Sequence, residues 1–297
     1  MEEILGLSFT NRSVAIAQIN PENEIGNGVS VHDILYPFPF EFNMILNEQN
    51  VELLTDRIGH HISNNFQGKF CAFSLPMYMA QMKRAALPAD LDEKIVQKHL
   101  QWEVENLSAR ELNEYKVIKL DHTFLFGTHQ EYVFVLVQKK ILQTVQKLAE
   151  KNALELKKVL LDFDSIHKYL AHFDLLDEQK NQIVFQIDAF YVTTLVYLNG
   201  LFYDYSLQPL TQKAEDKTFE EQVITVISAE MERVKSVVAQ LPQENQEFQV
   251  FTTRLVTDLL ARRLDETGVK ATHLSLEKQL AENGFSSNNI EAYAVIL

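Results

Sequence analysis

The sequence predicts an α/β protein made of two similar halves, with a smaller α+β unit inserted between them. The main observation is a repeated order of elements, three strands, a helix and a strand, which occurs near the start and again after residue 179. A second observation is the low count of nine glycines and seven prolines in 297 residues, which leaves little chain for disordered linkers. We therefore expect a first half from residues 1–76 plus 162–178, an inserted unit from 77–161, and a second half from 179–297.

The first half begins with three short runs rich in β-forming residues. They cover residues 4–9, 14–19 and 29–36, and the turns between them fall at 10–12 and 26–28. Residues 51–63 carry apolar side chains three or four positions apart, which predicts a helix. An apolar run at 69–75, just before Pro76, predicts a fourth strand.

The inserted unit opens with a predicted strand at 82–87. Asp90 and Glu93 then form a capping-box pair, which predicts the start of a helix that runs to residue 107. Further along we expect paired strands at 115–120 and 131–137, a helix at 141–151 and a strand at 156–161. Asp164 is expected to cap a helix to residue 173, which returns the chain to the first half.

The second half repeats the three-strand start. We expect strands at 183–188, 192–198 and 201–206, and Asn199-Gly200 predicts a type I′ hairpin between the last two. A long helix at 219–241 follows, with a stripe of apolar residues that ends at Leu241. A strand at 249–252, a helix at 255–266 and a strand at 269–273 complete the half.

Charge and composition exclude several classes of protein. The formal net charge of −14 argues against binding to nucleic acid and against an anionic membrane surface. The acidic start Met1-Glu2-Glu3 is unlike a secretory signal, and the apolar run at 133–137 is too short to span a bilayer. Cys71 is the single cysteine, so no internal disulfide forms. We expect a reduced, cytoplasmic protein, with Cys71 as an inert thiol in the core.

Several segments, taken in order, resemble the type IV pilus assembly protein PilM family, an actin-like relative of the division protein FtsA. The segments are residues 4–14, 73–76, 84–88, 133–137, 160–162 and 230–233. The cytoplasmic region of GspL from type II secretion is a close relative of this family. The resemblance covers nearly the whole chain, and it implies an actin-like (ribonuclease-H-type) fold of duplicated βββαβα domains.

The resemblance also implies a function. Proteins of this family are cytoplasmic scaffolds that lie at the bacterial inner membrane by gripping the N-terminal tail of a membrane partner, PilN, and they connect it to cytoplasmic motor or platform proteins. The tail lies in a groove between the first half and the inserted unit. At that junction we name Met79, Met82, Lys83, Arg84 and Leu87 as candidates. Methionines suit an adaptable groove and a strand edge can accept a peptide, although core filling is the alternative for these side chains.

The nucleotide site implied by the resemblance departs from the family pattern. An actin-like site needs glycines where two hairpins approach the phosphates, because only a missing Cβ allows such close contact. Ser8 stands where the family has Asp and Thr10 where it has Gly, and in the second hairpin Gln186 and Asp188 replace an acidic residue and a glycine. The adenosine turn lacks its Gly-Gly pair. The positions that we expect to form a degenerate site are Ser8, Thr10, Asn11, Gln186, Asp188, Thr252 and Thr253.

These departures favour a scaffold without enzymatic activity, catalytic residues, metal or cofactor. One alternative is an ATP-binding protein of the actin and sugar-kinase superfamily whose divergent site still holds ATP and magnesium. Another is a filament-forming protein similar to FtsA, although residues 288–297 lack the basic face of a membrane-binding helix. Asp162, Asp164 and His167 could in principle bind a metal, but a cap at Asp164 explains them better.

The aromatic segment at 36–42 has two readings. Its prolines exclude the interior of a helix or of a central strand. The rings either pack under the first half or form an exposed surface for a partner protein. The sequence favours packing.

Overall fold

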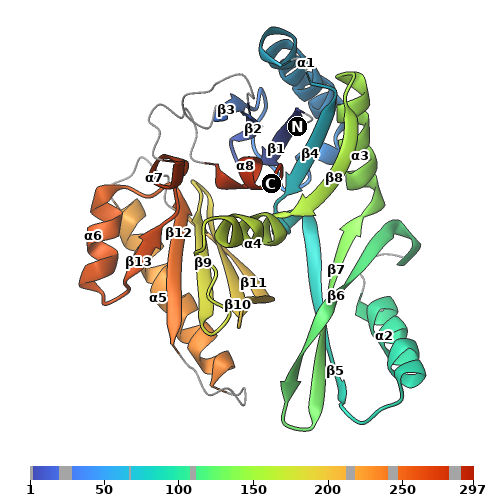
Figure 1. The fold of residues 1–297 in the computed structure, drawn as a ribbon, viewed down its shortest axis with the longest axis vertical. Coiled ribbons are helices and arrows are strands. Elements are labelled where there is room, and N and C mark those ends of the chain that lie inside the picture. Colours follow the sequence, from blue (N-terminus) through green and yellow to red (C-terminus); the bar gives the residue numbers. More distant parts are fainter. Residues whose placement is uncertain are drawn as a thin grey trace.

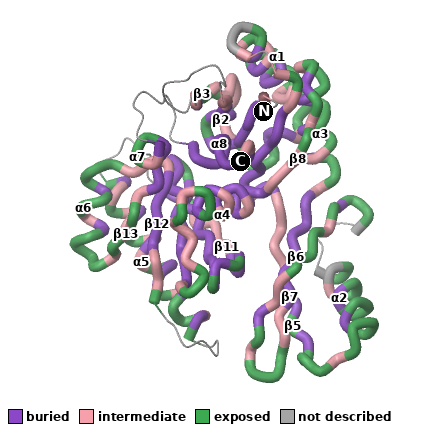
Figure 2. The backbone as a smooth tube through the Cα atoms, viewed as in Figure 1, coloured by how far each residue is buried: buried purple, intermediate pink, exposed green. Residues whose placement is uncertain are grey.

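The computed structural model describes residues 3–19, 29–66, 68–107, 112–211, 218–239, 247–280 and 289–297. Its backbone forms two five-stranded sheets and one three-stranded sheet (Figure 1). The predicted turn at 26–28 and Leu241, the predicted end of the long helix, lie outside the described residues. Buried residues run through the strands of both large sheets, whereas the outer sides of the peripheral helices are exposed (Figure 2).

The first sheet has the predicted three strands, helix and strand, plus one more strand. It contains β1 (Ile4–Phe9), β2 (Ser13–Ile19), β3 (Val29–Leu35), β4 (Phe70–Leu75) and β8 (Glu155–Leu161), in the order β3-β2-β1-β4-β8. β1 pairs antiparallel with β2 and parallel with β4. The helices of this half are α1 (Glu48–Asn65), α3 (Lys139–Lys151) and α4 (Asp162–His172), and the short turn Met44–Leu46 precedes α1.

The second sheet repeats the first, strand for strand. It contains β9 (Asn181–Ile187), β10 (Tyr191–Leu198), β11 (Leu201–Pro209), β12 (Phe248–Arg254) and β13 (Ala271–His273), in the order β11-β10-β9-β12-β13. Its helices are α5 (Phe219–Val238), α6 (Asp258–Glu266), α7 (Leu276–Leu280) and α8 (Ile290–Ala294). Asn199 and Gly200 have φ of +50° and +76°, as a type I′ turn requires. The predicted duplication is confirmed.

The inserted unit is an antiparallel sheet with one helix. It contains β5 (Ala80–Pro88), β6 (Tyr115–Phe126) and β7 (His129–Gln138) in the order β5-β7-β6, and two short turns, Met77–Met79 and Leu112–Glu114, precede β5 and β6. α2 (Glu93–Leu107) covers one face, where Val96 and Leu100 pack against Ala85 and Leu87 of β5. The odd-numbered residues of this part of β5 therefore face α2, and the even-numbered ones face the other way.

The C-terminal end predicted for the inserted unit is wrong. We assigned residues 141–161 to the inserted unit, but β8 pairs in parallel with β4, and α3 packs on β8. The inserted unit therefore ends with β7. The sequence predicted the strand β8 but not its pairing with β4, because a short apolar run fits an edge of either sheet equally well.

Two predicted helix caps also differ from the structure. The backbone N–H of Lys94 donates to the carboxylate of Asp92 at 2.9 Å, so Asp92 rather than Asp90 serves the start of α2. α4 begins at Asp162, which places Asp164 inside the first turn and not at the cap. Asp92 at α2 and Asp164 in α4 each still lie near the N-terminus of their helix, the positive end of the helix dipole.

The last helix, α8, leaves the second half and packs on the first. It contacts α4, β1, β2 and β4. Gly6 in β1 permits this approach, because a Cβ at that position would lie 2.0 Å from the backbone oxygen of Ala292. The end of the chain thus joins the two halves, and side chains of α8 reach the space between them.

Candidate functional site

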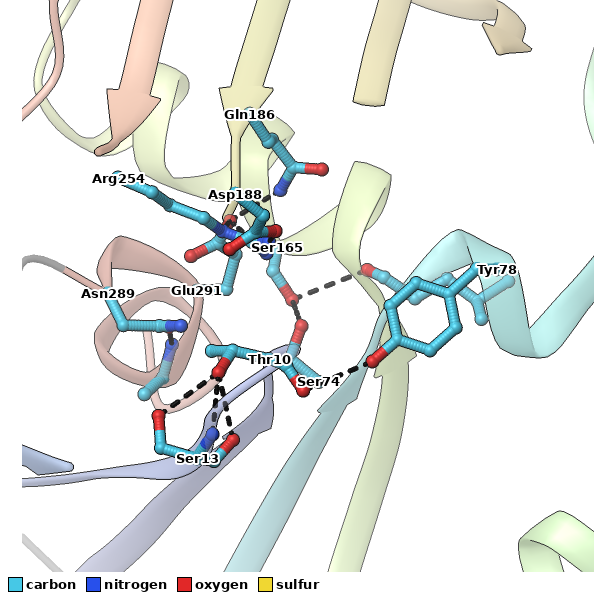
Figure 3. Close-up of polar contacts among 12 residues, drawn as sticks. Thr10, Ser13, Ser74, Tyr78, Ser165, Gln186, Asp188, Arg254, Asn289 and Glu291 are labelled. Carbon is cyan, nitrogen blue, oxygen red and sulfur yellow. Dashed lines mark hydrogen bonds and ion pairs between the residues drawn. The ribbon is translucent and has the colours of Figure 1, made fainter. Parts of the chain in front are cut away.

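The first boundary of the space between the halves is the turn between β1 and β2. The hydroxyl oxygen of Thr10 accepts hydrogen bonds from the backbone N–H groups of Arg12 at 3.1 Å and Ser13 at 3.0 Å. The hydroxyls of Tyr36 and Tyr78 both donate to the carbonyl oxygen of Thr10, at 2.8 and 3.2 Å. Two of the backbone N–H groups that this kind of turn could offer to an anion, those of Arg12 and Ser13, are therefore already bound by Thr10 (Figure 3).

The second boundary is the turn between β9 and β10. Asp188 follows β9, is 4% exposed, and pairs with the guanidinium of Arg254. Gln186 lies within β9, is fully buried, and its amide donates to the carboxylate of Glu291. Both residues thus bond side chains of the same chain, although the amide oxygen of Gln186 has no hydrogen-bond partner among the described residues.

The third boundary is the turn after β12. We placed the expected glycine pair at Thr252-Thr253, but both threonines lie inside β12 and are buried. Arg254, the last residue of the strand, has φ of +73°, the left-handed conformation that favours glycine. The turn after β12 therefore begins at Arg254, the residue after the predicted pair.

Arg254 is the centre of the site. Its guanidinium donates to Glu291 at 3.0 and 3.2 Å and also bonds Asp188 (Figure 3). The side chains of Arg254, Asp188 and Glu291 are 6%, 6% and 0% exposed. Burial raises the pKa of Asp188, and the positive charge of Arg254 opposes that rise. The two carboxylates outweigh the effect of burial on Arg254 and raise its pKa, so the guanidinium stays charged.

A cavity of about 420 Å³ remains beside this network. The three turns line it together with Asp33 and Leu35 of β3 and Asn289 at the start of α8. Asn11 is 2% exposed, and its amide nitrogen has no hydrogen-bond partner among the described residues. The charged side chains of the lining are two arginines, Arg12 and Arg254, and two aspartates, Asp33 and Asp188. The lining therefore carries no excess of positive charge for a polyphosphate.

Aromatic rings from three segments meet at the edge of the site. Phe40 and Phe190 stack with ring centroids 5.9 Å apart, and Tyr78 lies 5.4 Å from Phe42 and 5.5 Å from Tyr191. Phe42 and Phe190 remain 45% and 46% exposed. The segment at 36–42 thus packs, as the sequence favoured, but across to the second half, and it keeps part of its aromatic surface exposed.

The five residues predicted for the partner-tail groove do not line one surface. Met79 and Leu87 are buried, at 5% and 3% exposed, and Leu87 lies under α2. Met82 is half-buried against the cores of both halves, and Lys83 points to the opposite face of β5. Arg84 donates to the hydroxyl of Tyr203 at 2.9 Å, so it contacts the second half. Four of the five residues lie on β5, an edge strand of the inserted sheet, and Met79 lies in the short turn just before it.

The site depends on residues that the sequence did not single out. Arg254 and Glu291 are the main ones, and Asn289 caps α8 through its side chain. The sequence did contain a signal for Glu291, which is the single charged side chain in the otherwise apolar end of the chain. A charged residue in such a segment is expected to be buried and paired with an opposite charge. No pattern identified Arg254, because an arginine after a strand is usually exposed.

Other titratable groups lie nearby or in the core. Burial raises the pKa of Asp162, at the start of α4, to about 7, and the charge of Arg254 acts against this. Cys71 is buried in β4 as predicted, and burial raises the pKa of its thiol to about 12. In the part of the chain that the structure describes, no group of three or more His, Cys, Asp or Glu side chains could hold a metal ion. Within the same residues, no helix combines the length and the apolar character needed to cross a membrane.

Comparison with known proteins establishes the fold. Neither a scan against protein-family models nor a search of curated proteins finds a match. Among solved structures, one described as "PilM-PilN type IV pilus biogenesis complex" matches with a TM-score of 0.69 at 12% identity, over 98% of this chain and 97% of that chain.

Two further structures match with a TM-score of 0.53. One is a Bacteroides thetaiotaomicron protein with an actin-like ATPase fold and unknown function, at 11% identity over 99% of this chain and 95% of that chain. The other is the cytoplasmic domain of EpsL, an inner membrane component of the type II secretion system of Vibrio cholerae, at 8% identity over 98% and 92%. The chain therefore has the actin-like fold that the resemblance implied. At sequence identities this low, the likeness establishes the fold alone.

Proposed function

We propose that this protein is a non-enzymatic scaffold of a type IV pilus or type II secretion assembly machine, and that it needs no nucleotide. In this role it binds the N-terminal tail of an inner-membrane partner similar to PilN and lies at the cytoplasmic face of the membrane through that partner. The fold-level likeness to the PilM-PilN complex and to the EpsL domain supports this choice of machine.

One observation supports a site without a nucleotide: side chains of the protein itself occupy all three turns around the cleft. The hydroxyl of Thr10 binds the N–H groups of the first turn, Asp188 in the second turn binds Arg254, and Arg254 occupies the third. In an actin-like ATP site, such turns must offer donors and space to phosphates. Here a side chain already occupies each of them.

Electrostatics support the same conclusion. A triphosphate could use Arg254 only by displacing Asp188 or Glu291, which are 6% and 0% exposed. A buried carboxylate left without its partner costs about 3–5 kcal/mol. Phosphates close to these carboxylates would also be repelled, since the interior screens charge weakly.

We place the tail of the partner along the free edge of β5. An edge strand can accept an extended peptide through its backbone, and side chains of both faces then contact the peptide. Met82 and Lys83 lie at the middle of β5 and on opposite faces, next to the junction with the first half. Both are half-buried, so each has surface left for contact.

The test is a titration with a synthetic peptide that copies the N-terminal tail of the membrane protein encoded next to this one. Met82→Ala and Lys83→Ala should each weaken binding by about tenfold, the scale of a contact residue at an interface. Ile118→Ala on β6, the opposite edge of the same sheet and 38% exposed, is the matched control and should bind normally.

Thermal unfolding of each variant shows whether the fold is kept. Normal binding by both β5 variants would move the site away from β5. If the tail binds the wild type only when ATP and magnesium are present, the nucleotide-free scaffold is wrong.

A further inference from the structure

A groove lies on the outer side of the first half, between α1 and α3, and encloses about 450 Å³. Its floor is apolar and contains Ile45, Leu46 and Val51. Lys140 and Lys147 stand on the α3 wall, seven residues and hence about two turns apart. Neither has an ion-pair partner among the described residues.

The opposite wall of this groove, on α1, is acidic. Glu48 and Glu52 stand there, one turn apart. A weak surface pair joins Glu52 to Lys151 at 4.0 Å, with both side chains at least half exposed. The α3 wall also carries Lys151, Glu150 and two uncharged polar residues, Gln143 and Thr144. The groove therefore has an apolar part, an acidic wall on α1 and a wall on α3 in which three lysines outnumber one glutamate.

α2 of the inserted unit carries an outward stripe that no part of the chain covers among the described residues. Ile95 and Trp102 are seven residues apart and are 52% and 55% exposed, and the ring of His99 lies 5.8 Å from that of Trp102. Trp102 is the only tryptophan of the protein. Exposed tryptophans of this kind are enriched at the centres of protein interfaces.

The charges beside this stripe match the walls of the groove. Helical spacing places Lys94, Lys98 and Glu105 on one side of the Ile95–Trp102 stripe, where the lysines are in excess, and Glu103 on the other. If the stripe enters the groove, the two lysines face Glu48 and Glu52, and Glu103 faces Lys140 and Lys147.

We propose that α2 of one copy of this protein docks in the groove between α1 and α3 of a second copy, with Trp102 on the apolar floor. The volume of the groove is at the scale of pockets that take small ligands, so it accommodates one indole ring. The acidic wall disfavours an anionic lipid surface as the occupant, because Glu48 and Glu52 would repel it. This contact involves neither the cleft nor β5 and goes beyond the proposed function.

The two surfaces lie at opposite ends of the molecule. α1 and α3 are at one end of the long axis, and α2 is near the other (Figure 1). A contact between two different surfaces is heterologous, so each added copy presents a new free groove or a new free α2. The association is therefore head-to-tail, and it grows beyond a dimer into a ring or a filament.

Sedimentation velocity on the purified full chain, without any partner, tests this. The wild type should form species that grow with concentration and shrink as salt rises, because the contact is partly ionic. Trp102→Ala removes the indole ring from the exposed stripe of α2, and Lys147→Glu reverses one charge on the α3 wall of the groove. Each variant alone should associate at least about tenfold more weakly.

A mixture of the two variants gives the sharpest readout. Trp102→Ala keeps an intact groove and Lys147→Glu keeps an intact α2, so an equimolar mixture should form a dimer and nothing larger. Lys139→Glu, the same charge change on the same helix outside the groove, and Leu259→Ala, an exposed leucine of α6, are matched controls and should associate like the wild type.

A wild type that stays monomeric at all concentrations overturns the proposal. So does normal association of the two variants, or a mixture that fails to pair. Thermal unfolding confirms that each variant folds.

Discussion

Arg254 combines three features that rarely coincide in one residue. It has a left-handed backbone, it is buried, and it carries a charge that two carboxylates share. The backbone conformation costs about 1–3 kcal/mol for a side chain other than glycine, so the surrounding contacts must hold it in place. The ion network with Asp188 and Glu291 supplies those contacts.

Removing the guanidinium should therefore destabilise the protein strongly. We expect Arg254→Ala to lower the free energy of unfolding by about 3–5 kcal/mol, because it leaves two buried carboxylates unpaired. Arg262→Ala, at an exposed arginine of α6, should change it by less than about 0.5 kcal/mol. Urea unfolding measures both. If Arg254→Ala lowered the free energy of unfolding no more than Arg262→Ala does, the ion network around Arg254 would not stabilise the protein.

Asp162 predicts a pH dependence with a definite sign. Its pKa in the folded protein is raised to about 7, above the value near 3.9 of an unfolded chain. The folded state then holds more protons between these values, so the stabilising contribution is complete below pH 4 and is lost as pH rises through 7. The slope is at most about 1.4 kcal/mol per pH unit.

The measurement is a series of urea unfolding curves from pH 5 to pH 8. Asp162→Asn should remove this part of the slope, whereas Asp121→Asn, at an exposed position of β6, should keep the profile of the wild type. An unchanged slope in the Asp162 variant would assign the pH dependence to other groups.

At the scale of elements, the packing of α8 on β1 depends on the absence of a Cβ atom at Gly6. A Cβ at Gly6 would meet the backbone oxygen of Ala292 at 2.0 Å and Ile296 at 2.9 Å. Because backbone cannot move aside cheaply, α8 would have to shift, and with it Glu291. We expect Gly6→Ala to cost about 2 kcal/mol or more, as overpacking does.

Gly59→Ala is the matched control. Its added Cβ would meet only the end of the flexible Asn152 side chain, and alanine is the better helix former in α1. Thermal unfolding should therefore show a lower Tm for the Gly6 variant and an equal or higher Tm for the Gly59 variant. Equal Tm values for the two variants would mean that α8 adapts freely.

Element type was predictable because each pattern is local. The apolar stripe of α1, the buried runs of β1 and β4 and the Asn199-Gly200 turn all follow from neighbouring residues. The partner of β8 was not predictable, because pairing is a long-range choice between two sheets that both accept an apolar edge strand. The length of β6 was underestimated, since a bulge between Lys119 and Thr123 interrupts its alternation.

The site was predictable in part for the same reason. The two hairpin turns were located from their positions after apolar strands, and the structure places Thr10 and Asp188 at them. The end of the strand before the third turn was not predictable, because the β-forming residues Thr252 and Thr253 give no sign that the strand continues to Arg254. The role of Glu291 needed the fold, since α8 reaches the cleft only after the chain has crossed to the first half.

At the scale of the whole molecule, contacts within the chain join all three parts. Arg254 and Glu291 bridge the cleft, and Phe163 of α4 stacks on Phe202 of β11 with centroids 4.0 Å apart. Arg84 of the inserted sheet bonds Tyr203 of the second half and lies 3.8 Å from Asp204, which also pairs with Arg233. A bound nucleotide is therefore not needed to hold the halves together.

The most direct test of this account is a calorimetric titration of the full chain with ATP and magnesium, checked by a thermal-shift assay. We expect no heat of binding and no rise in Tm at millimolar nucleotide, because side chains of the protein itself occupy the three turns of the cleft. Binding at micromolar concentration, with a rise in Tm that depends on magnesium, would contradict the account and show that the cleft still holds a nucleotide.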